Sequence, residues 1–285
     1  MSNGIKLKAG LEIHQQLDTN KLFCECPSQL RNDSPKFIVR RELNPVIGES
    51  GEMDVAVVHE KLKQRVFSYE VYDTNCLVEL DEEPPHNLNK EALKISLQIA
   101  LLLNCKIFPV MQVMRKTVID GSNTSGFQRT VLIAHDGFIE TSLGKVGIET
   151  IALEEDAART VSNESGRATY RLDRLGIPLV EITTKPDLKT PEQIKEAALK
   201  IGEILRSCKV KRGIGTIRQD LNISTEGAER AEIKGFQDPK MMILTVEQET
   251  KRQQTLIKIT EELKKRKAKI NSKDIPDGDI VIGGF

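Results

Sequence analysis

The sequence predicts an α+β fold in which helices cover the back of an antiparallel sheet. Three observations lead to this class. Several segments alternate apolar and polar residues with a period of two, which indicates strands with one polar face. Other segments carry apolar residues at helical spacing. Strands and helices are mixed without the regular alternation that a doubly wound fold requires.

The first expected strand runs from Ile5 to Ile13, where every second residue is apolar. Its other face carries Glu12 and His14, which lie about 6.7 Å apart along a strand. Residues 27–60 are rich in Pro, Asn, Glu and Gly, and this composition favours loops and short strands.

The middle of the chain predicts a helix, a hairpin and a second helix. Residues 87–104 have a largely apolar helical pattern with asparagines at the start that can cap it. Strand-like runs follow over residues 131–152, and Asp136-Gly137 suits the hairpin turn. Thr190 then caps a helix that has proline at its first position.

A long helix is expected from Pro239 towards Lys267, and residues 274–285 are typical of a linker. We therefore divide the chain into a main domain over residues 1–240 and a helix with linker over residues 241–285. The basic run at residues 264–267 suits a solvated helix C-terminus, and an RNA-phosphate patch is the alternative.

The charge balance restricts the possible partners. Lys+Arg and Asp+Glu both number 42 in 285 residues, so no overall field favours nucleic acid or membrane. No apolar run reaches the roughly 20 residues of a membrane span. The first residues lack the apolar core of a signal peptide. A cytoplasmic location without membrane contact is expected.

The five cysteines do not form a disulfide framework, because their number is odd and their spacing is irregular. Cys24 and Cys26 have the spacing of half a zinc site, but a second pair is missing. Reduced cysteines on a strand or turn are therefore the favoured interpretation, and zinc is the alternative.

Polar faces like that of Glu12 and His14 recur in residues 179–183, 216–224 and 230–234. Each face taken alone fits a sheet in contact with water. Together they concentrate short carboxylates, asparagine and one histidine. Clustered carboxylates repel one another, and oxygen ligands suit Mg²⁺, so a shared cation site is the functional interpretation.

Phosphate binding by a glycine-rich loop is excluded, because neither GxxxxGK[ST] nor GxGxxG occurs. Phosphates would instead be held by metal and side chains. The cationic candidates are Arg115, Lys116, Arg174 and Arg218, and the donor-rich segment 115–130 adds Ser122 and Asn123.

Six segments in order resemble motifs of the GatB/GatE family, the B-type and E-type subunits of tRNA-dependent amidotransferases. They are GLEIHQQLDTNKLFCECP, RKTVIDGSNTSGFQRT, LEEDAART, YRLDRLGIPLVEITTKPDL, GTIRQDLNIS and AEIKGFQD, and the resemblance as a whole runs from about Leu7 to Gln254. The second, third and fourth are more similar to the archaeal E-type branch than to the bacterial B-type branch.

The resemblance implies a catalytic cradle domain over residues 1–240, with a fold like glutamine synthetase and guanido kinases. It implies ATP- and Mg²⁺-dependent transamidation of Glu-tRNA(Gln) to Gln-tRNA(Gln) by way of a γ-glutamyl phosphate. Ammonia would come from a partner, an asparaginase-like glutaminase subunit, within a full-length heterotetramer.

The resemblance also implies the site residues. The metal ligands would be Glu12, His14, Glu155, Glu181, Asp220 and Glu232, and Glu12, His14, Glu155 and Asp220 would be catalytic. Periodicity leaves Glu154 and Glu155 undecided, and the resemblance favours Glu155. Arg115, Lys116, Ser122, Asn123, Arg174 and Arg218 would bind ATP.

Members of this family are longer, so the chain is expected to be a fragment that lacks an inserted domain and a helical tail. Two alternatives follow. A bacterial protein of the B type would also act on aspartyl-tRNA(Asn), and a non-catalytic fragment would only bind tRNA or support assembly.

Overall fold

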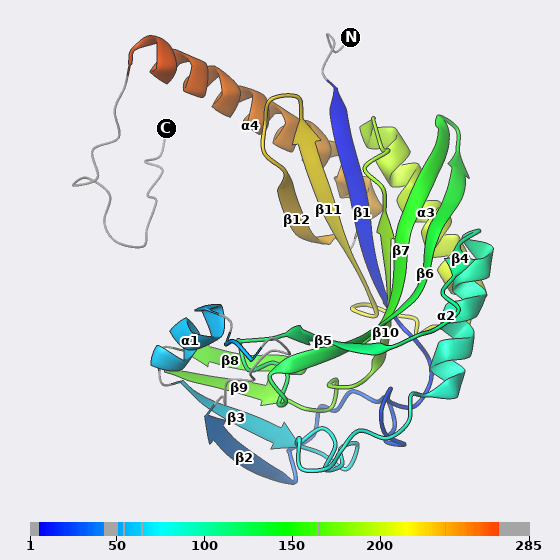
Figure 1. The fold of residues 1–285 in the computed structure, drawn as a ribbon, viewed down its shortest axis with the longest axis vertical. Coiled ribbons are helices and arrows are strands. Elements are labelled where there is room, and N and C mark those ends of the chain that lie inside the picture. Colours follow the sequence, from blue (N-terminus) through cyan, green and yellow to red (C-terminus); the bar gives the residue numbers. More distant parts are fainter. Residues whose placement is uncertain are drawn as a thin grey trace.

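An eight-stranded sheet forms the centre of the molecule in the computed structural model (Figure 1). The structure describes residues 6–267, apart from residues 43–50, 54, 64, 165 and 237. The strand order is β12-β11-β1-β10-β7-β6-β4, with β5 also paired to β6, and all these pairs are antiparallel. The strands are β1 (Leu7–Gln16), β4 (Lys106–Ile107), β5 (Val113–Thr117), β6 (Phe127–Thr141), β7 (Gly144–Glu155), β10 (Pro178–Thr184), β11 (Ile217–Thr225) and β12 (Ala231–Phe236).

A four-stranded sheet lies beyond one end of the large sheet, next to β5 (Figure 1). Its order is β2 (Phe37–Glu42), β3 (Val66–Val71), β9 (Arg167–Arg171) and β8 (Arg159–Glu164), and β3 and β9 run parallel. Phe67, Tyr69 and Tyr170 are buried on one face, with the two tyrosine rings 6.1 Å apart. This sheet therefore has a small aromatic core of its own.

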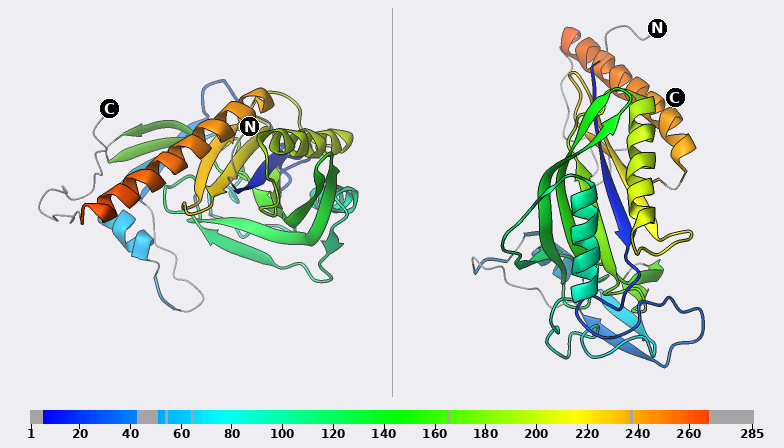
Figure 2. Two further views of the ribbon diagram at one scale, coloured as in Figure 1. Left: turned by 90° about the horizontal axis from the view of Figure 1, so that it is seen from above. Right: turned by 90° about the vertical axis from the view of Figure 1, so that its right-hand side faces the viewer.

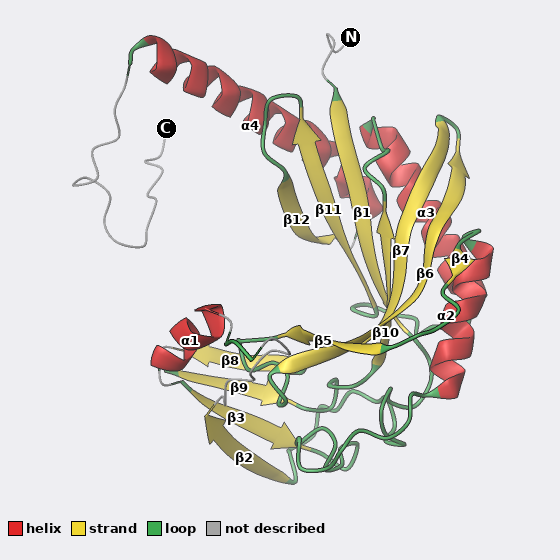
Figure 3. Ribbon diagram, viewed as in Figure 1, coloured by secondary structure: helices red, strands yellow, loops and turns green. Residues whose placement is uncertain are grey.

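The helices α2 (Lys90–Leu102) and α3 (Pro191–Ser207) pack on the same face of the large sheet (Figures 2 and 3). As predicted, an asparagine caps α2, since Asn89 accepts hydrogen bonds from the amides of Glu91 and Ala92. Thr190 caps α3 in the same way, with Pro191 at the first position. The short helix α1 (Val55–Leu62) lies near the four-stranded sheet.

The predicted long helix is α4 (Pro239–Lys265). Its first half belongs to the packed domain, because Met242 and Val246 are fully buried and Gln253 bonds to β11. Residues 274–285, expected to be a linker, lie outside the described residues. None of the described helices combines the length and hydropathy needed to cross a membrane.

The hairpin of β6 and β7 exists, but its turn is not at Asp136-Gly137 as predicted. β6 continues to Thr141, and Ser142 and Leu143 form the turn. Gly137 lies at a crowded position instead, because a Cβ added there would be 2.2 Å from the sulfur of Cys105. The glycine lets β6 approach the residues that follow α2.

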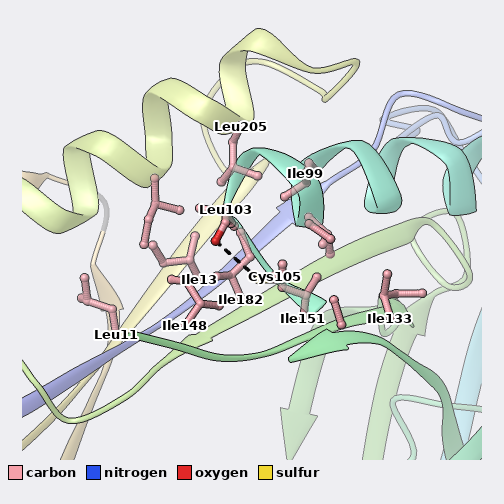
Figure 4. Close-up of a cluster of buried hydrophobic side chains, with 14 of the residues drawn as sticks. Leu11, Ile13, Ile99, Leu103, Cys105, Ile133, Ile148, Ile151, Ile182 and Leu205 are labelled. Atoms are coloured by element: carbon pink, nitrogen blue, oxygen red, sulfur yellow. Dashed lines mark hydrogen bonds between the residues drawn. The ribbon is translucent and has the colours of Figure 1, made fainter. Parts of the chain in front are cut away.

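The main core fills the space between the large sheet and its helices (Figure 4). Leu11, Ile13 and Ile182 project from the strands towards Ile99 of α2 and Leu205 of α3, and each is 0–1% exposed. Because side chains alternate along a strand, the residues between them must project from the opposite face. The coarse prediction is confirmed: the fold mixes helices with an antiparallel sheet that has one polar face.

Candidate metal and phosphate site

The strand register collects polar side chains on the face of the sheet that the helices leave open. His14 on β1 lies opposite Glu181 on β10 and Arg218 on β11, and Glu12 lies opposite Asp220. Directly opposite side chains in an antiparallel pair share a face. Segments about 200 residues apart along the chain thus meet on one surface.

Glu12, His14 and Glu181 form the tightest group on this face, which we call the open-face cluster. His14 Nε2 lies 3.2 Å from Glu181 Oε2 and 3.5 Å from Glu12 Oε1. One donor atom of each residue lies within 4.8 Å of the others. Two carboxylates and an imidazole with open positions around them suit Mg²⁺ or Mn²⁺.

The electrostatics of the open-face cluster reflect its crowding. Burial and the charge of Glu181 raise the pKa of Glu12, although His14 opposes this. Burial alone would lower the pKa of His14, but its hydrogen bond with Glu181 and the charge of Glu12 raise it. Burial opposes ionisation of Glu181, but the hydrogen bond with His14 and the charge of Lys116 lower its pKa to about 2. The cluster therefore attracts positive charge.

Glu154, on β7, joins this cluster through Lys116. The Lys116 ammonium donates to Glu154 and lies 3.4 Å from Glu181 Oε2. Thr130 and Gln128 also donate to Glu154, at 3.1 and 3.2 Å. Lys116, which is predicted to bind phosphate, contacts the carboxylates of Glu154 and Glu181.

Glu155, which is predicted as a metal ligand and catalytic residue, lies apart from the open-face cluster in the structure. Glu155 projects from the other face of β7, is 5% exposed, and accepts a hydrogen bond from Arg129 Nη1 at 3.0 Å. Neighbouring strand residues point to opposite faces, so only Glu154 reaches the cluster. Burial raises the pKa of Glu155, and Arg129 offsets only part of this effect.

Asp220 and Glu232 extend the open face towards its edge. Asp220 accepts the Gly235 amide at 2.9 Å, and Lys234 Nζ lies 3.4 Å from Asp220 and 2.9 Å from Glu232. Of the six predicted ligands, three form the open-face cluster, Asp220 lies beside it, and Glu232 is linked to Asp220 through Lys234.

Arg174 and Arg218 converge on Asp156. Arg218 Nη2 lies 3.1 Å and Arg174 Nε 3.6 Å from the same carboxylate oxygen of Asp156. Gln16, on the open face, donates to the other oxygen at 2.7 Å. The two arginines thus form a second charged group, next to His14 through the β1–β11 pair.

Arg115, Ser122 and Asn123 do not join the open-face cluster. Arg115 pairs across the strands with Arg129, so it faces the other side, where it lines a hollow of about 770 Å³. Ser122 Oγ donates to Asp120 at 2.7 Å. Asn123 is buried and lines a small cavity with Glu155 and Arg129.

A second donor group lies away from the open face. Cys24, Cys26, Cys76 and Glu79 each place a donor atom within 4.8 Å of the others. Three thiols and one carboxylate provide the four ligands of a tetrahedral zinc site. The sequence indicated only Cys24 and Cys26. Cys76 and Glu79 were missed because a glutamate replaces the second cysteine of a paired motif.

The thiol cluster contains a buried ion pair and one thiol with a lowered pKa. Lys21 is fully buried with its Nζ 3.3 Å from Glu79 Oε1. The hydrogen bond from Cys24 lowers the pKa of Cys26 to about 7, whereas burial raises that of Cys76 to about 11. At least one thiolate is therefore accessible near neutral pH.

The structure defines the chain as an α+β domain with a candidate cation site. Helices cover the back of its antiparallel sheet, and carboxylates, a histidine and a lysine lie on the open face. The chain belongs to the GatB/GatE family, since the family model described as GatB/GatE catalytic domain matches residues 7–274.

The chain is similar to proteins named as the E-type subunit of glutamyl-tRNA(Gln) amidotransferase. The chain and the protein of Methanocaldococcus jannaschii are 56% identical over 272 residues. The aligned region covers 94% of this chain and 43% of the relative. For the protein of Pyrococcus abyssi the identity is 54% over 273 residues, covering 95% and 43%. The chain spans less than half the length of these curated relatives.

Proposed function

We propose that this chain carries the ATP- and Mg²⁺-dependent step that converts Glu-tRNA(Gln) to Gln-tRNA(Gln). The observation that carries the proposal is the convergence of Glu12, His14 and Glu181, from two neighbouring strands, within 4.8 Å. The printed names of the relatives support the substrate.

The reaction needs activation because hydroxide is a poor leaving group from a carboxylate. A γ-carboxylate oxygen of the glutamyl group attacks the γ-phosphorus of ATP, and ADP leaves. Ammonia then attacks the acyl carbon, inorganic phosphate leaves, and a proton is released as the amide forms. Such phosphoryl transfer depends mainly on positioning and charge neutralisation.

The residues of the open face suit these roles. Glu12, His14 and Glu181, with Glu154 beside them, would hold Mg²⁺, which supplies charge neutralisation to phosphate oxygens when bound. Lys116 donates to anionic oxygens already, so it can donate to a phosphate in the same position. Asp220 orients the edge of the site through Gly235 and Lys234.

We also propose that the domain has a cradle-shaped fold of the glutamine synthetase and guanido kinase type. The support is an antiparallel sheet with a polar open face and helices on its back. The proposed assembly is a cytoplasmic full-length heterotetramer in which an asparaginase-like glutaminase supplies ammonia. The relatives are named as one subunit among several, which supports a multi-subunit enzyme.

A non-catalytic tRNA-binding fragment is the second candidate, and the part of the relatives that this chain does not span favours it. The basic run gives it little support, because Arg266 already pairs with Glu262 at 2.8 Å. A bacterial protein of the B type is less supported, because the relatives reported above are named as E-type subunits.

Calorimetry of this chain with ATP and Mg²⁺ tests the proposal. We expect Mg²⁺-dependent ATP binding that Glu12→Gln and Glu181→Gln abolish, and full-length enzyme with either change should no longer convert Glu-tRNA(Gln). Glu140→Gln, an exposed residue on β6, is the control. Salt-sensitive tRNA binding without ATP binding would favour the non-catalytic candidate instead.

A further inference from the structure

Exposed apolar side chains gather along residues 101–114, between the end of α2 and the start of β5. Six of them are at least 37% exposed, and we call this group the edge patch: Leu101, Leu102, Ile107, Val110, Val113 and Met114. Soluble domains rarely leave a group of large apolar side chains uncovered, and such a surface is typical of a contact with another molecule. The mechanism proposed above uses none of these six residues.

The edge patch follows one border of the large sheet (Figure 1). β4 and β5 both pair with β6, and no other described strand pairs with either of them. The Val118 amide donates to the Gly126 carbonyl oxygen at 2.9 Å, in the same register as β5 and β6. Hydrogen-bonded positions alternate along an antiparallel pair, so the amides of Val113 and Thr117 point away from β6. The border therefore offers backbone donors to a further strand.

A hollow of about 770 Å³ lies beside this border, and Val113 is part of its wall. Its apolar lining comes from Phe23, Pro84, Pro85, Leu88, Val113 and Phe127. A strand that is added to an edge makes backbone hydrogen bonds there, and its alternate side chains enter pockets beside that edge. The border and the hollow together therefore fit an extended apolar segment of another protein.

The border is basic, which restricts the identity of such a segment. Residues 92–119 contain no Asp or Glu, but they include Lys94, Lys106, Arg115 and Lys116. Among the described residues, none forms an ion pair with Lys106. The acidic residues 81–83 also line the hollow, but they precede α2 and lie outside the border strands. A second copy of this chain, paired through β5, would bring the same basic strands side by side, and like charges would repel. A different protein with carboxylates beside its apolar residues is complementary.

We infer that this border of the large sheet binds a partner subunit, which adds an extended apolar segment with flanking carboxylates to β5 and places an apolar side chain in the hollow. The partner is the asparaginase-like glutaminase of the proposed function, so the inference rests on that function. Backbone hydrogen bonds to β5 supply affinity, and the hollow and Lys106 supply specificity.

Calorimetry of this chain with the asparaginase-like subunit of the same organism tests the inference. Val110→Lys and Leu101→Lys should each weaken binding at least about tenfold, because each places a charge within an apolar contact. Ile214→Lys, before β11, and Leu199→Lys, on α3, are matched controls, since both residues are exposed and apolar but lie outside the edge patch. Mg²⁺-ATP binding should be the same in all four variants, and thermal melting establishes that each is folded.

Position 113 separates the backbone contact from the side-chain contact. Val113→Ala removes most of the apolar side chain but keeps the amide, whereas Val113→Pro also removes the outward donor. Proline is tolerated at the first residue of an edge strand, so both variants should melt close to the parent. Val113→Pro should bind the subunit about fivefold more weakly than Val113→Ala. Equal affinities of the two variants would overturn the addition of a strand to β5.

Two further measurements keep this inference separate from the proposed function. In the assembled full-length enzyme, Val110→Lys should lower glutamine-supported amidation at least about tenfold and leave amidation with added ammonium salt unchanged, because only the delivery of ammonia depends on the partner. Amide hydrogen exchange should show protection of residues 107–117 when the subunit binds. The inference is wrong if the parent chain does not bind the subunit, or if protection appears only elsewhere. Absent Mg²⁺-ATP binding by the parent chain would instead defeat the proposed function.

Discussion

His14 and Glu181 face each other across β1 and β10, with the imidazole Nε2 3.2 Å from the carboxylate. The pair is held by the strand register and is backed by Ile13 and Ile182, which are fully buried on the other face. Rigid elements thus set the positions of two candidate metal ligands before any cation binds.

We expect His14→Ala to lower Mn²⁺ affinity at least about tenfold, because it removes one of three donors from the open-face cluster. Electron paramagnetic resonance of free Mn²⁺ measures this directly. His135→Ala is the matched control, since His135 pairs with Asp136 on β6 rather than with the cluster. Equal Mn²⁺ affinity in the two variants would refute the metal assignment.

Glu154→Gln and Glu155→Gln should have opposite effects. Glu154→Gln should weaken Mn²⁺ binding and lower the free energy of unfolding less than Glu155→Gln does, because Glu154 is buried but its charged partner Lys116 is half exposed and remains in contact with water. Glu155→Gln should cost about 3 kcal/mol, because it leaves Arg129 buried without a counter-charge. Urea denaturation and Mn²⁺ titration measure both effects, and the reverse pattern would restore Glu155 as the ligand.

The thiol cluster predicts bound zinc. Purified chain should contain about one Zn²⁺ by elemental analysis, and Cys76→Ser should lose it and melt at a lower temperature. Cys208→Ser, a buried cysteine outside the cluster, is the control. Zinc-free protein after refolding with excess Zn²⁺ would leave reduced cysteines as the better interpretation.

We expect Glu249 to stabilise the folded protein at neutral pH and to lose this contribution in acid. Its hydrogen bonds with Arg252, at 2.7 and 2.8 Å, lower its pKa in the folded state. A lowered carboxyl pKa means that the contribution is complete above about pH 5 and is lost as the pH falls through the folded-state value.

Glu249→Gln should therefore be less stable than the parent by about 0.5–1 kcal/mol at pH 7, with the difference shrinking below about pH 4. Denaturant unfolding at several pH values measures it. Glu247→Gln, exposed on the same helix, should show no such trend. A difference that does not change with pH would contradict the assigned ion pair.

Alternation along the strands was enough to predict the sheet, its polar face and the positions of Glu12 and His14. It was not enough for Glu154 and Glu155, because Ile151, Ala152 and Leu153 before them are all buried. A strand covered on both faces shows no alternation, so the sequence cannot reveal which glutamate points where.

Other features depend on contacts that no local pattern encodes. Cys76 joins Cys24 only through the tertiary fold, and Gly137 lies within β6, where it allows a close approach to Cys105.

The opposite orientations of Glu154 and Glu155 restrict how this protein can change length. A single residue inserted upstream within β7 would move every later side chain to the opposite face of the sheet, so Glu154 would leave the open face and Glu155 would replace it there. The exposed turn at Ser142 and Leu143 has no such constraint. Insertions, labels or fused domains are therefore tolerated at that turn, whereas the strand itself must keep its residue count.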